Sequence, residues 1–106
     1  MIHLIKMKTI YTTENFDEWF GALRDKLAAK RIQASIDRAE DGNFGDHKSV
    51  GEGVTEMRIH HGPGYRVYFT LQGLEVVILL AGGDKSTQST DIKLACALKR
   101  QLKETE

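Results

Sequence analysis

The sequence predicts an α+β fold in the order β-α-α-β-β-β-α: a small antiparallel sheet, an N-terminal helical hairpin and a C-terminal helix. Apolar residues recur at helical spacing in the first third of the chain and near its end, and they alternate with period two in the middle. A chain of 106 residues has the length of one domain, which we expect to span residues 1–106.

One strand and two helices are predicted in the first half. Lys6–Thr12 is moderately apolar and β-branched at its end, and Thr12 and Thr13 can cap the following helix. That helix has apolar side chains at i, i+3, i+4, i+7 and i+11, namely Phe16, Trp19, Phe20, Leu23 and Leu27. A second stripe, which ends at a left-handed Gly42, comprises Ala29, Ile32, Ile36 and Ala39. A break near Asp25–Ala28 would fold the two stripes into a helical hairpin.

A strand hairpin is predicted in the middle of the chain. Asn43–Gly53 is rich in glycine and polar residues and is predicted to be a loop. Val54–His60 alternates with period two, and a second alternating strand begins at Tyr65. Between them, Gly62-Pro63-Gly64 has the residues of a tight turn, because proline fixes one φ and glycine accepts positive φ.

A buried strand and a helix are predicted to complete the fold. Leu74–Ala81 is almost wholly apolar, as is typical of a central strand that is covered on both faces. The last helix is expected from about Ser89 to Lys103. Its predicted core stripe consists of Leu94, Ala97, Leu98 and Leu102.

Composition and charge exclude several functional classes. Fifteen Lys and Arg against fifteen Asp and Glu give a net charge of zero, which argues against non-specific binding along nucleic acid. No apolar run approaches the roughly 18 residues of a membrane span, and Met1–Lys8 is too short and mixed for a signal peptide. We therefore expect a cytoplasmic protein without a membrane partner. The single cysteine, Cys96, excludes an internal disulfide and a cysteine-based zinc site, and it is expected to be buried and inert.

Cationic groups gather on one predicted face of the hairpin. Alternation places Glu56, Arg58 and His60 on the same face, and strand pairing adds Arg66 and Tyr68. Like charges side by side on a sheet repel each other, and a bound phosphate would relieve this repulsion through bidentate bonds to guanidinium groups. The alternative is a solvated sheet face on which Glu56 partly neutralises the arginines.

Lys85 and Asp91 lie outside the hairpin strands and are expected close to the same face. Lys85 follows the apolar strand and could add a cation at the mouth of the face. Asp91, in the first turn of the last helix, either opposes the helix dipole or takes part in the chemistry. His60 could act as a general acid or base near neutral pH. His60 and His61 are adjacent on a strand and point to opposite faces, so they cannot share a metal ion, and no metal is predicted.

Two long segments, GNFGDHKSVGEGVTEMRIHHGPGYRVYF and LLAGGDKSTQSTDI, closely resemble the RelE/ParE superfamily of bacterial toxins. More narrowly, they resemble the HigB-like addiction module killer protein group. The resemblance covers nearly the whole chain and implies a RelE-like toxin of a type II toxin–antitoxin system, with a cognate antitoxin as its partner. Many members resemble mRNA interferases, endoribonucleases that cleave messenger RNA on the ribosome and so inhibit translation. They need no metal or small-molecule cofactor, because the 2′-hydroxyl of the RNA attacks the adjacent phosphorus.

The resemblance assigns roles to residues by their position in these segments. It implies that Arg66, in Gly-Tyr-Arg, binds the scissile phosphate, and that Arg58 and Lys85 are further catalytic cations. These three residues and Tyr68 form the expected RNA-binding surface.

The acid and base roles stay open, with His60 and Asp91 as the candidates for the base. The sequence departs from the best-known ribonucleases in having Asp91 where tyrosine is common and Glu56 where lysine is common. Two other functions also stay open. One is a ParE-like inhibitor of DNA gyrase that acts through the helical hairpin, Phe16–Ala39. The other is a non-toxic subunit that modulates repression of its operon.

Overall fold

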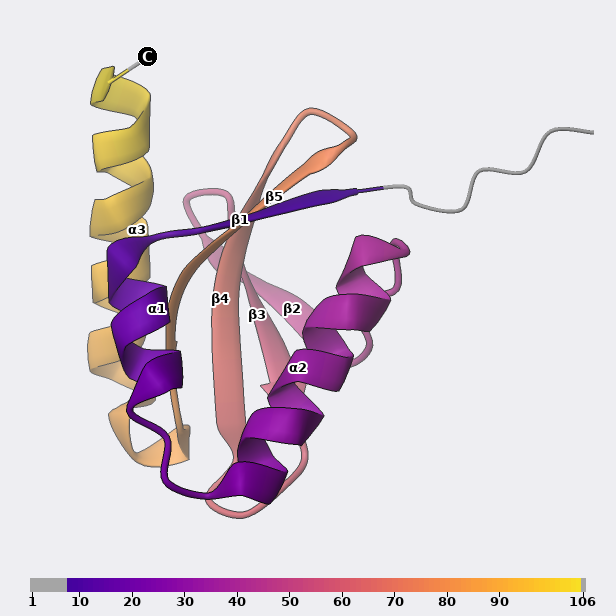
Figure 1. Cartoon of the computed structure of the whole chain (residues 1–106). Helices are drawn as coiled ribbons and strands as arrows, with labels where there is room; N and C mark the ends of the chain where they lie inside the picture. Colours follow the sequence, from indigo (N-terminus) through magenta and orange to yellow (C-terminus); the bar gives the residue numbers. More distant parts are fainter. Residues whose placement is uncertain (1–7, 106) are drawn as a thin grey trace, which may run out of the picture.

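The computed structural model describes residues 8–105, with side chains up to residue 102. Over that range the chain forms a five-stranded sheet and three α-helices (Figure 1). The elements are β1 (Thr9–Thr12), α1 (Glu14–Gly21), α2 (Lys26–Glu40), β2 (His47–Gly51), β3 (Val54–Ile59), β4 (Tyr65–Gln72), β5 (Val76–Gly83), a short 3-10 helix (Lys85–Thr87) and α3 (Gln88–Thr105). The predicted α+β fold with an N-terminal helical hairpin and a C-terminal helix is confirmed.

The sheet has the strand order β1-β5-β4-β3-β2 and differs from the prediction in two respects. First, β1 pairs with β5 in parallel, so the sheet is mixed rather than purely antiparallel. Second, β2 forms inside Asn43–Gly53, which was predicted to be a loop, and pairs with β3 as an antiparallel edge strand. The part of the predicted first strand before residue 8 lies outside the described residues.

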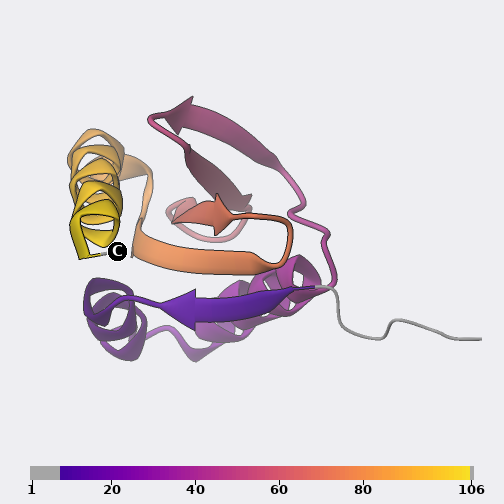
Figure 2. The same ribbon diagram turned by 90° about the horizontal axis from the view of Figure 1, so that it is seen from above.

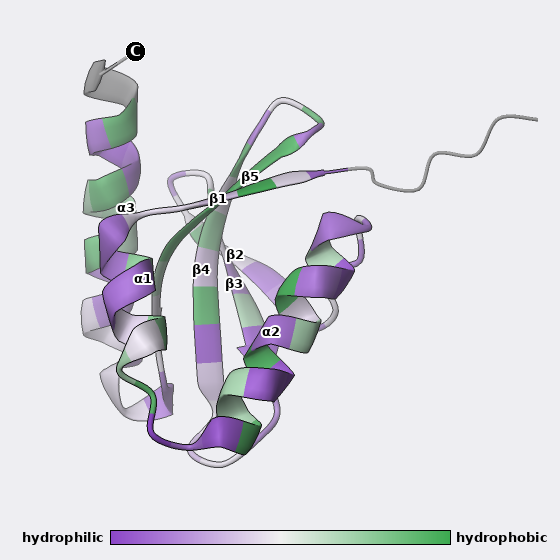
Figure 3. Cartoon of the chain, viewed as in Figure 1, coloured by the Kyte–Doolittle hydropathy of each residue, from purple (hydrophilic) through white to green (hydrophobic). Residues whose placement is uncertain are grey.

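Helices cover both faces of the sheet and enclose two apolar cores (Figure 2). The core beneath α1 and α2 is the larger: Phe16, Ile32, Ile36, Ala39, Met57, Ile59, Val67, Phe69, Val77 and Leu79. The core beneath α3 comprises Val54, Tyr68, Ile78, Leu80, Ala81, Ala95 and Cys96. Strand β5 supplies residues to both cores, which confirms that it is covered on both faces, and its apolar character is visible in Figure 3. Within residues 8–105, no helix has the length and apolar character needed to cross a bilayer.

The helical hairpin is defined by its caps. Thr13 caps α1, because its Oγ1 accepts a hydrogen bond from the Phe16 amide at 3.1 Å. The Asp25 side chain caps α2 by accepting from two amides of its first turn. The break between α1 and α2 confirms the predicted helical hairpin. It also shortens the first apolar stripe, because α1 ends at Gly21 and Leu27 lies in α2 with 52% of its surface exposed. Gly42, with φ +90°, follows α2 as predicted.

The core face of α3 contains Leu98 and Leu102 of the predicted stripe, which pack against the core, and differs from the stripe elsewhere. Leu94 is 38% exposed, whereas Ala95 and Cys96 are buried against the sheet. The buried face is therefore turned from the predicted one toward Ala95 and Cys96. Small side chains at Ala95 and Cys96 allow α3 to approach the sheet closely. The predicted burial of Cys96 is confirmed, and burial raises the pKa of its thiol.

Gly82 allows α1 to pack directly on β5. A Cβ at this position would lie 2.2 Å from Trp19 Cε3, and the Trp19 ring is itself packed between Phe16 and Tyr65. We therefore expect Gly82→Ala to lower the free energy of unfolding by about 1–3 kcal/mol through overpacking. Urea denaturation checks this, with Gly21→Ala as the control, since a Cβ there meets no atom within 4 Å. Equal destabilisation by both substitutions would contradict the packing argument.

Candidate functional site

Glu56 on β3 lies at the centre of the predicted charged face. Its side chain is completely buried, and its two carboxylate oxygens are bound by four neighbours. Oε1 accepts from Arg58 Nε at 3.1 Å, and Oε2 accepts from Gln88 Nε2 at 2.7 Å and from the Tyr68 hydroxyl at 3.2 Å. Arg66 Nε lies 3.4 Å from Oε2 as an ion pair. We call these five residues the arginine cluster.

Strand register brings the arginine cluster together. Arg58 lies directly opposite Arg66, and Glu56 lies directly opposite Tyr68, on the face that α3 covers. Two opposed guanidinium groups would repel each other, and the buried Glu56 carboxylate between them removes that repulsion. The centre of the face is therefore buried beneath α3 rather than solvated, and an internal carboxylate neutralises the arginines there.

Electrostatics fix the protonation states of the two buried acids. Burial alone raises the pKa of Glu56, but the hydrogen bonds from Gln88 and Arg58, the charge of Arg66 and the Tyr68 hydroxyl outweigh it, so this pKa is lowered. Burial, followed by the negative charge of Glu56, raises the pKa of Tyr68 far above its usual range. Tyr68 therefore stays a neutral phenol that donates to Glu56, and its side chain is buried beneath the surface that RNA was predicted to contact.

Arg66 extends from the cluster toward the turn between β3 and β4. Its side chain is 13% exposed, and its Nη1 donates to the Gly64 carbonyl at 2.8 Å. A Cβ at Gly64 would lie 3.3 Å from Arg66 Nη1 and 3.5 Å from Lys85 Cβ, so the turn, the guanidinium and the exposed Lys85 adjoin one another. The structure thus brings Arg58, Arg66 and Lys85 to one end of the sheet.

Asp91 joins this end of the sheet from the first turn of α3. Its Oδ2 accepts from Thr87 Oγ1 at 2.5 Å and would lie only 1.8 Å from a Cβ at Gly83, so glycine is needed for this approach. Gly83 pairs with Arg66 in the sheet, and the charge of Asp91 contributes to the raised pKa of Tyr68. Asp91 therefore lies beside the arginine cluster, in addition to its favourable place at a helix N-terminus.

His60 lies at the outer edge of this region and is bound elsewhere. Its Nε2 lies 2.7 Å from Asp46 Oδ2, and its side chain is 76% exposed. The hydrogen bond with His60 and the charge of Arg58 hold the pKa of Asp46 below its usual value. His61 instead pairs with Asp25 at 3.4 Å, so the two histidines bind separate carboxylates. Within residues 8–105, no group of three or more His, Cys, Asp or Glu side chains is placed to hold a metal ion.

Three contributors to the site were not predicted, namely Gln88, Asp46 and Asp84. Gln88 belongs to the GDKSTQ segment quoted above, which was the only signal for it, and Asp46 lies in the predicted loop. Asp84 is a further carboxylate here, with a pKa lowered by hydrogen bonds from Ser86 and in part by the charge of Arg66. The site cations therefore face four carboxylates, which are Glu56, Asp46, Asp84 and Asp91. An anion would be held here by directed hydrogen bonds rather than by surplus positive charge.

This architecture places the chain in the RelE-like α+β fold. It superposes on a double arginine-to-alanine mutant of the E. coli toxin RelE in its free state with a TM-score of 0.64. The alignment covers 82% of this chain and 96% of that chain at 13% sequence identity, and it establishes the fold. Residues 18–102 match the family described as Phage derived protein Gp49-like (DUF891), and the chain belongs to this family. An uncharacterized protein of Haemophilus influenzae is 52% identical over 93 residues, which are 88% of this chain and 94% of that protein.

Proposed function

We propose that this protein is a toxin of the RelE type, of the HigB-like group, that cleaves messenger RNA on the ribosome without a metal and thereby inhibits translation. The fold and the Gp49-like family support the toxin class. The observation that carries the nuclease proposal is the convergence of Arg58, Arg66 and Lys85 from three segments at one end of the sheet, with Asp91 beside them.

Cleavage would proceed by attack of a ribose 2′-oxygen on the adjacent phosphorus. The new bond joins the 2′-oxygen to phosphorus, and the bond from phosphorus to the 5′-oxygen of the next nucleotide breaks. Arg66 and Lys85 would bind the phosphate oxygens as negative charge builds up on them. Asp91 or His60 would accept the 2′-hydroxyl proton, and the leaving 5′-oxygen would take up a proton from water. The products are a 2′,3′-cyclic phosphate and a 5′-hydroxyl end. Tyr68 supports Arg66 through Glu56, and as a neutral phenol it does not serve as the base.

The ribosome would hold and orient the RNA, which the balanced charge of the site does not attract strongly. Because the cations are matched by carboxylates, long-range attraction of RNA to this face is weak. A messenger RNA held in fixed geometry by the ribosome needs only to be oriented against Arg66, which lowers the entropic part of the barrier. The site would thus act on presented RNA in the cytoplasm, and it would leave free RNA largely intact.

An antitoxin encoded with this protein would neutralise it by covering the same end of the sheet. An acidic or amphipathic segment could compete with phosphate for Arg66 and Lys85. We expect binding of such a partner to depend on the exposed Lys85 more than on the buried Glu56.

The charge balance of the site favours one second candidate, inhibition of DNA gyrase by a protein-binding surface on the helical hairpin. Cleavage of ribosome-bound messenger RNA by the purified protein separates the two. We expect cuts inside the coding region of a translated message, seen by primer extension, and none in the same RNA without ribosomes. Intact messages together with inhibited DNA supercoiling would overturn the nuclease proposal in favour of gyrase.

Substitution of Asp91 tests its proposed role in proton transfer. We expect Asp91→Asn to lower the single-turnover cleavage rate by about 10²–10⁴-fold, the usual contribution of a general acid or base. The amide oxygen can still accept from Thr87, so the fold is expected to persist. Asp37→Asn, on an exposed position of α2, is the control and should leave the rate unchanged. An unchanged rate in Asp91→Asn, with a large loss in His60→Ala, would assign the base to His60 instead.

A further inference from the structure

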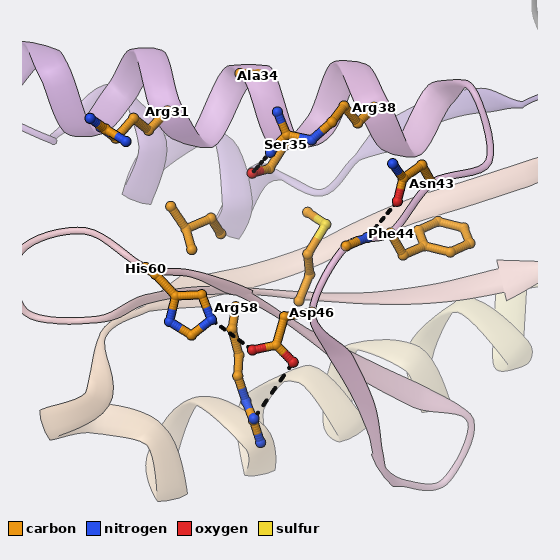
Figure 4. A pocket seen from close by; sticks show the side chains of 12 residues that line it. Arg31, Ala34, Ser35, Arg38, Asn43, Phe44, Asp46, Arg58 and His60 are labelled. Atoms are coloured by element: carbon orange, nitrogen blue, oxygen red, sulfur yellow. Dashed lines mark hydrogen bonds and ion pairs between the residues drawn. The ribbon is translucent and has the colours of Figure 1, made fainter.

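A cavity of about 390 Å³ lies between α2, the connection from α2 to β2 and the end of β3, on the face of the sheet opposite to α3 (Figure 4). Met57 and Ile59 of β3 line it and are almost fully buried, with 2% and 6% of their surfaces exposed. Arg31 and Arg38 of α2 also line the cavity, and their side chains lie along the helix. An apolar floor beneath a polar rim, in a cavity of this size, is the usual form of a small-molecule site.

The arginines of α2 are available to bind an anion here. Arg31, Ser35 and Arg38 follow one another at i, i+4 and i+7, so they share one face of the helix. Arg38 Nη2 donates to Ser35 Oγ at 3.1 Å, and Arg31 is exposed and has no hydrogen bond or ion pair to any residue in the part of the chain that the structure describes. The carboxylate lining the cavity, Asp46, is already bound by His60. In contrast to the arginine cluster, this cavity therefore has surplus positive charge.

The cavity and the arginine cluster lie on opposite faces of the sheet and share Arg58 near its edge. Arg58 lines the cavity, its Nε donates to Glu56, and its Nη1 lies 3.7 Å from Asp46 at the cavity rim. A single polymer chain that passes Arg58 could bind both in the cavity and at the arginine cluster. Such a polymer needs a repeated anion for the arginines and a flat apolar group for Met57 and Ile59. RNA has both in every nucleotide, since its bases present apolar faces and its phosphates match guanidinium geometry.

We propose that this cavity binds one nucleotide of RNA, with the base against Met57 and Ile59 and the phosphate at Arg31 and Arg38. This proposal rests on the proposed ribonuclease function and adds to it a subsite on the other side of the sheet edge from the cleavage site. The subsite would fix the position of the strand relative to Arg66 and select among bases by their fit to the cavity floor. A segment of acidic protein would satisfy the arginines but would leave the apolar floor without a flat partner.

Methyl NMR tests the proposal, because Met57 and Ile59 carry reporter groups on the cavity floor. Protein with ¹³C-labelled methionine and isoleucine methyl groups is titrated with each of the four nucleoside 5′-monophosphates and, separately, with inorganic phosphate at the same ionic strength. We expect saturable shifts of the Met57 and Ile59 methyl groups with at least one nucleotide and no shift of Ile92, which belongs to α3 and packs on the other face of the sheet.

Matched variants identify the anion contact. Arg31→Ala combined with Arg38→Ala should weaken nucleotide binding by at least about tenfold, since both guanidinium contacts are lost. Lys26→Ala combined with Lys30→Ala removes the same charge from the same helix at positions that do not line the cavity. That control should change the affinity by less than about threefold, because screened charges at a distance contribute little.

Several outcomes would overturn the proposal. The first is the absence of saturable methyl shifts. The second is equal shifts with inorganic phosphate alone, which would leave an anion site without a base. The third is tighter binding of a hexaglutamate peptide than of any nucleotide, which would indicate a protein partner. Nucleotide binding without messenger RNA cleavage would remove the ribonuclease function but leave the cavity assignment, and cleavage without nucleotide binding would remove the cavity assignment alone.

Discussion

Glu56→Ala is expected to lower the free energy of unfolding by about 3–5 kcal/mol, the usual cost of removing one partner from a buried ion pair. Two arginines, the Tyr68 hydroxyl and the Gln88 amide converge on this carboxylate. Its loss would leave the Tyr68 hydroxyl buried without an acceptor and Arg66, which is only 13% exposed, without its counter-ion. Domains of this size are stable by about 5–15 kcal/mol in total, so the variant would be marginal.

Urea denaturation at neutral pH measures this loss, and Glu52→Ala is the matched control. Glu52 also forms an ion pair, with Arg100 at 2.6 Å, but both side chains are more than half exposed. Exposed pairs contribute at most about 1 kcal/mol, so the control should lie close to the wild type. Similar losses in the two variants would mean that Glu56 is not the organising charge of the cluster.

The same carboxylate predicts a dependence of stability on pH. The folded-state pKa of Glu56 lies below its ordinary value of 4.5, so the unfolded chain takes up a proton more readily than the folded chain does. Its stabilisation is therefore complete above about pH 4.5 and is lost as the pH falls further, through the folded-state pKa. In Glu56→Gln this contribution is absent, so the difference in urea midpoint between wild type and variant should shrink between pH 5 and about pH 3. A difference that stays constant over this range would contradict the lowered pKa.

Arg66→Ala is expected to lower the cleavage rate of ribosome-bound messenger RNA by about 10²–10³-fold, because it removes donors aimed at the developing charge. Arg66 also neutralises Glu56, so part of any loss could come from a weakened fold. The Lys85→Ala variant separates a loss of catalysis from a loss of stability. Lys85 is exposed, and we expect its loss to lower the rate by about tenfold without a change in stability. Lys93→Ala, at an exposed position of α3, should leave both unchanged. Full activity of a folded Lys85→Ala variant would show that this end of the sheet takes no part in RNA cleavage.

The elements that a sequence pattern can predict are those with a strong apolar period. The helical hairpin, the β3–β4 hairpin and the buried strand β5 all have such patterns, and all three form. β2 was missed because the sequence of His47–Gly51 is HKSVG and four of its five residues are exposed, so this edge strand has almost no apolar signal. The parallel pairing of β1 with β5 depends on tertiary arrangement, which local spacing does not encode.

The candidate site was predicted only in part, because Gln88, Asp46 and Asp84 were missed, and its electrostatics were not predicted. Alternation placed Glu56, Arg58, Arg66 and Tyr68 on one face, and register confirms this placement. That α3 covers the centre of the face could not be read from period alone, because the sheet face on which a helix packs depends on tertiary arrangement. Burial of Glu56 beneath α3 makes this face an internally neutralised one rather than a bare cationic surface.

Induced expression of the wild type and of Arg66→Ala, followed by mapping of 5′-hydroxyl ends across cellular transcripts, tests the central claim most directly. Arg24→Ala, which removes an exposed arginine from the connection between α1 and α2, is the control. The proposed function predicts growth arrest with new 5′-hydroxyl ends inside coding regions for the wild type and Arg24→Ala, and neither for a folded Arg66→Ala protein. Growth arrest without such ends, equally strong in Arg66→Ala, would contradict the account and would show that this face of the sheet does not cleave RNA.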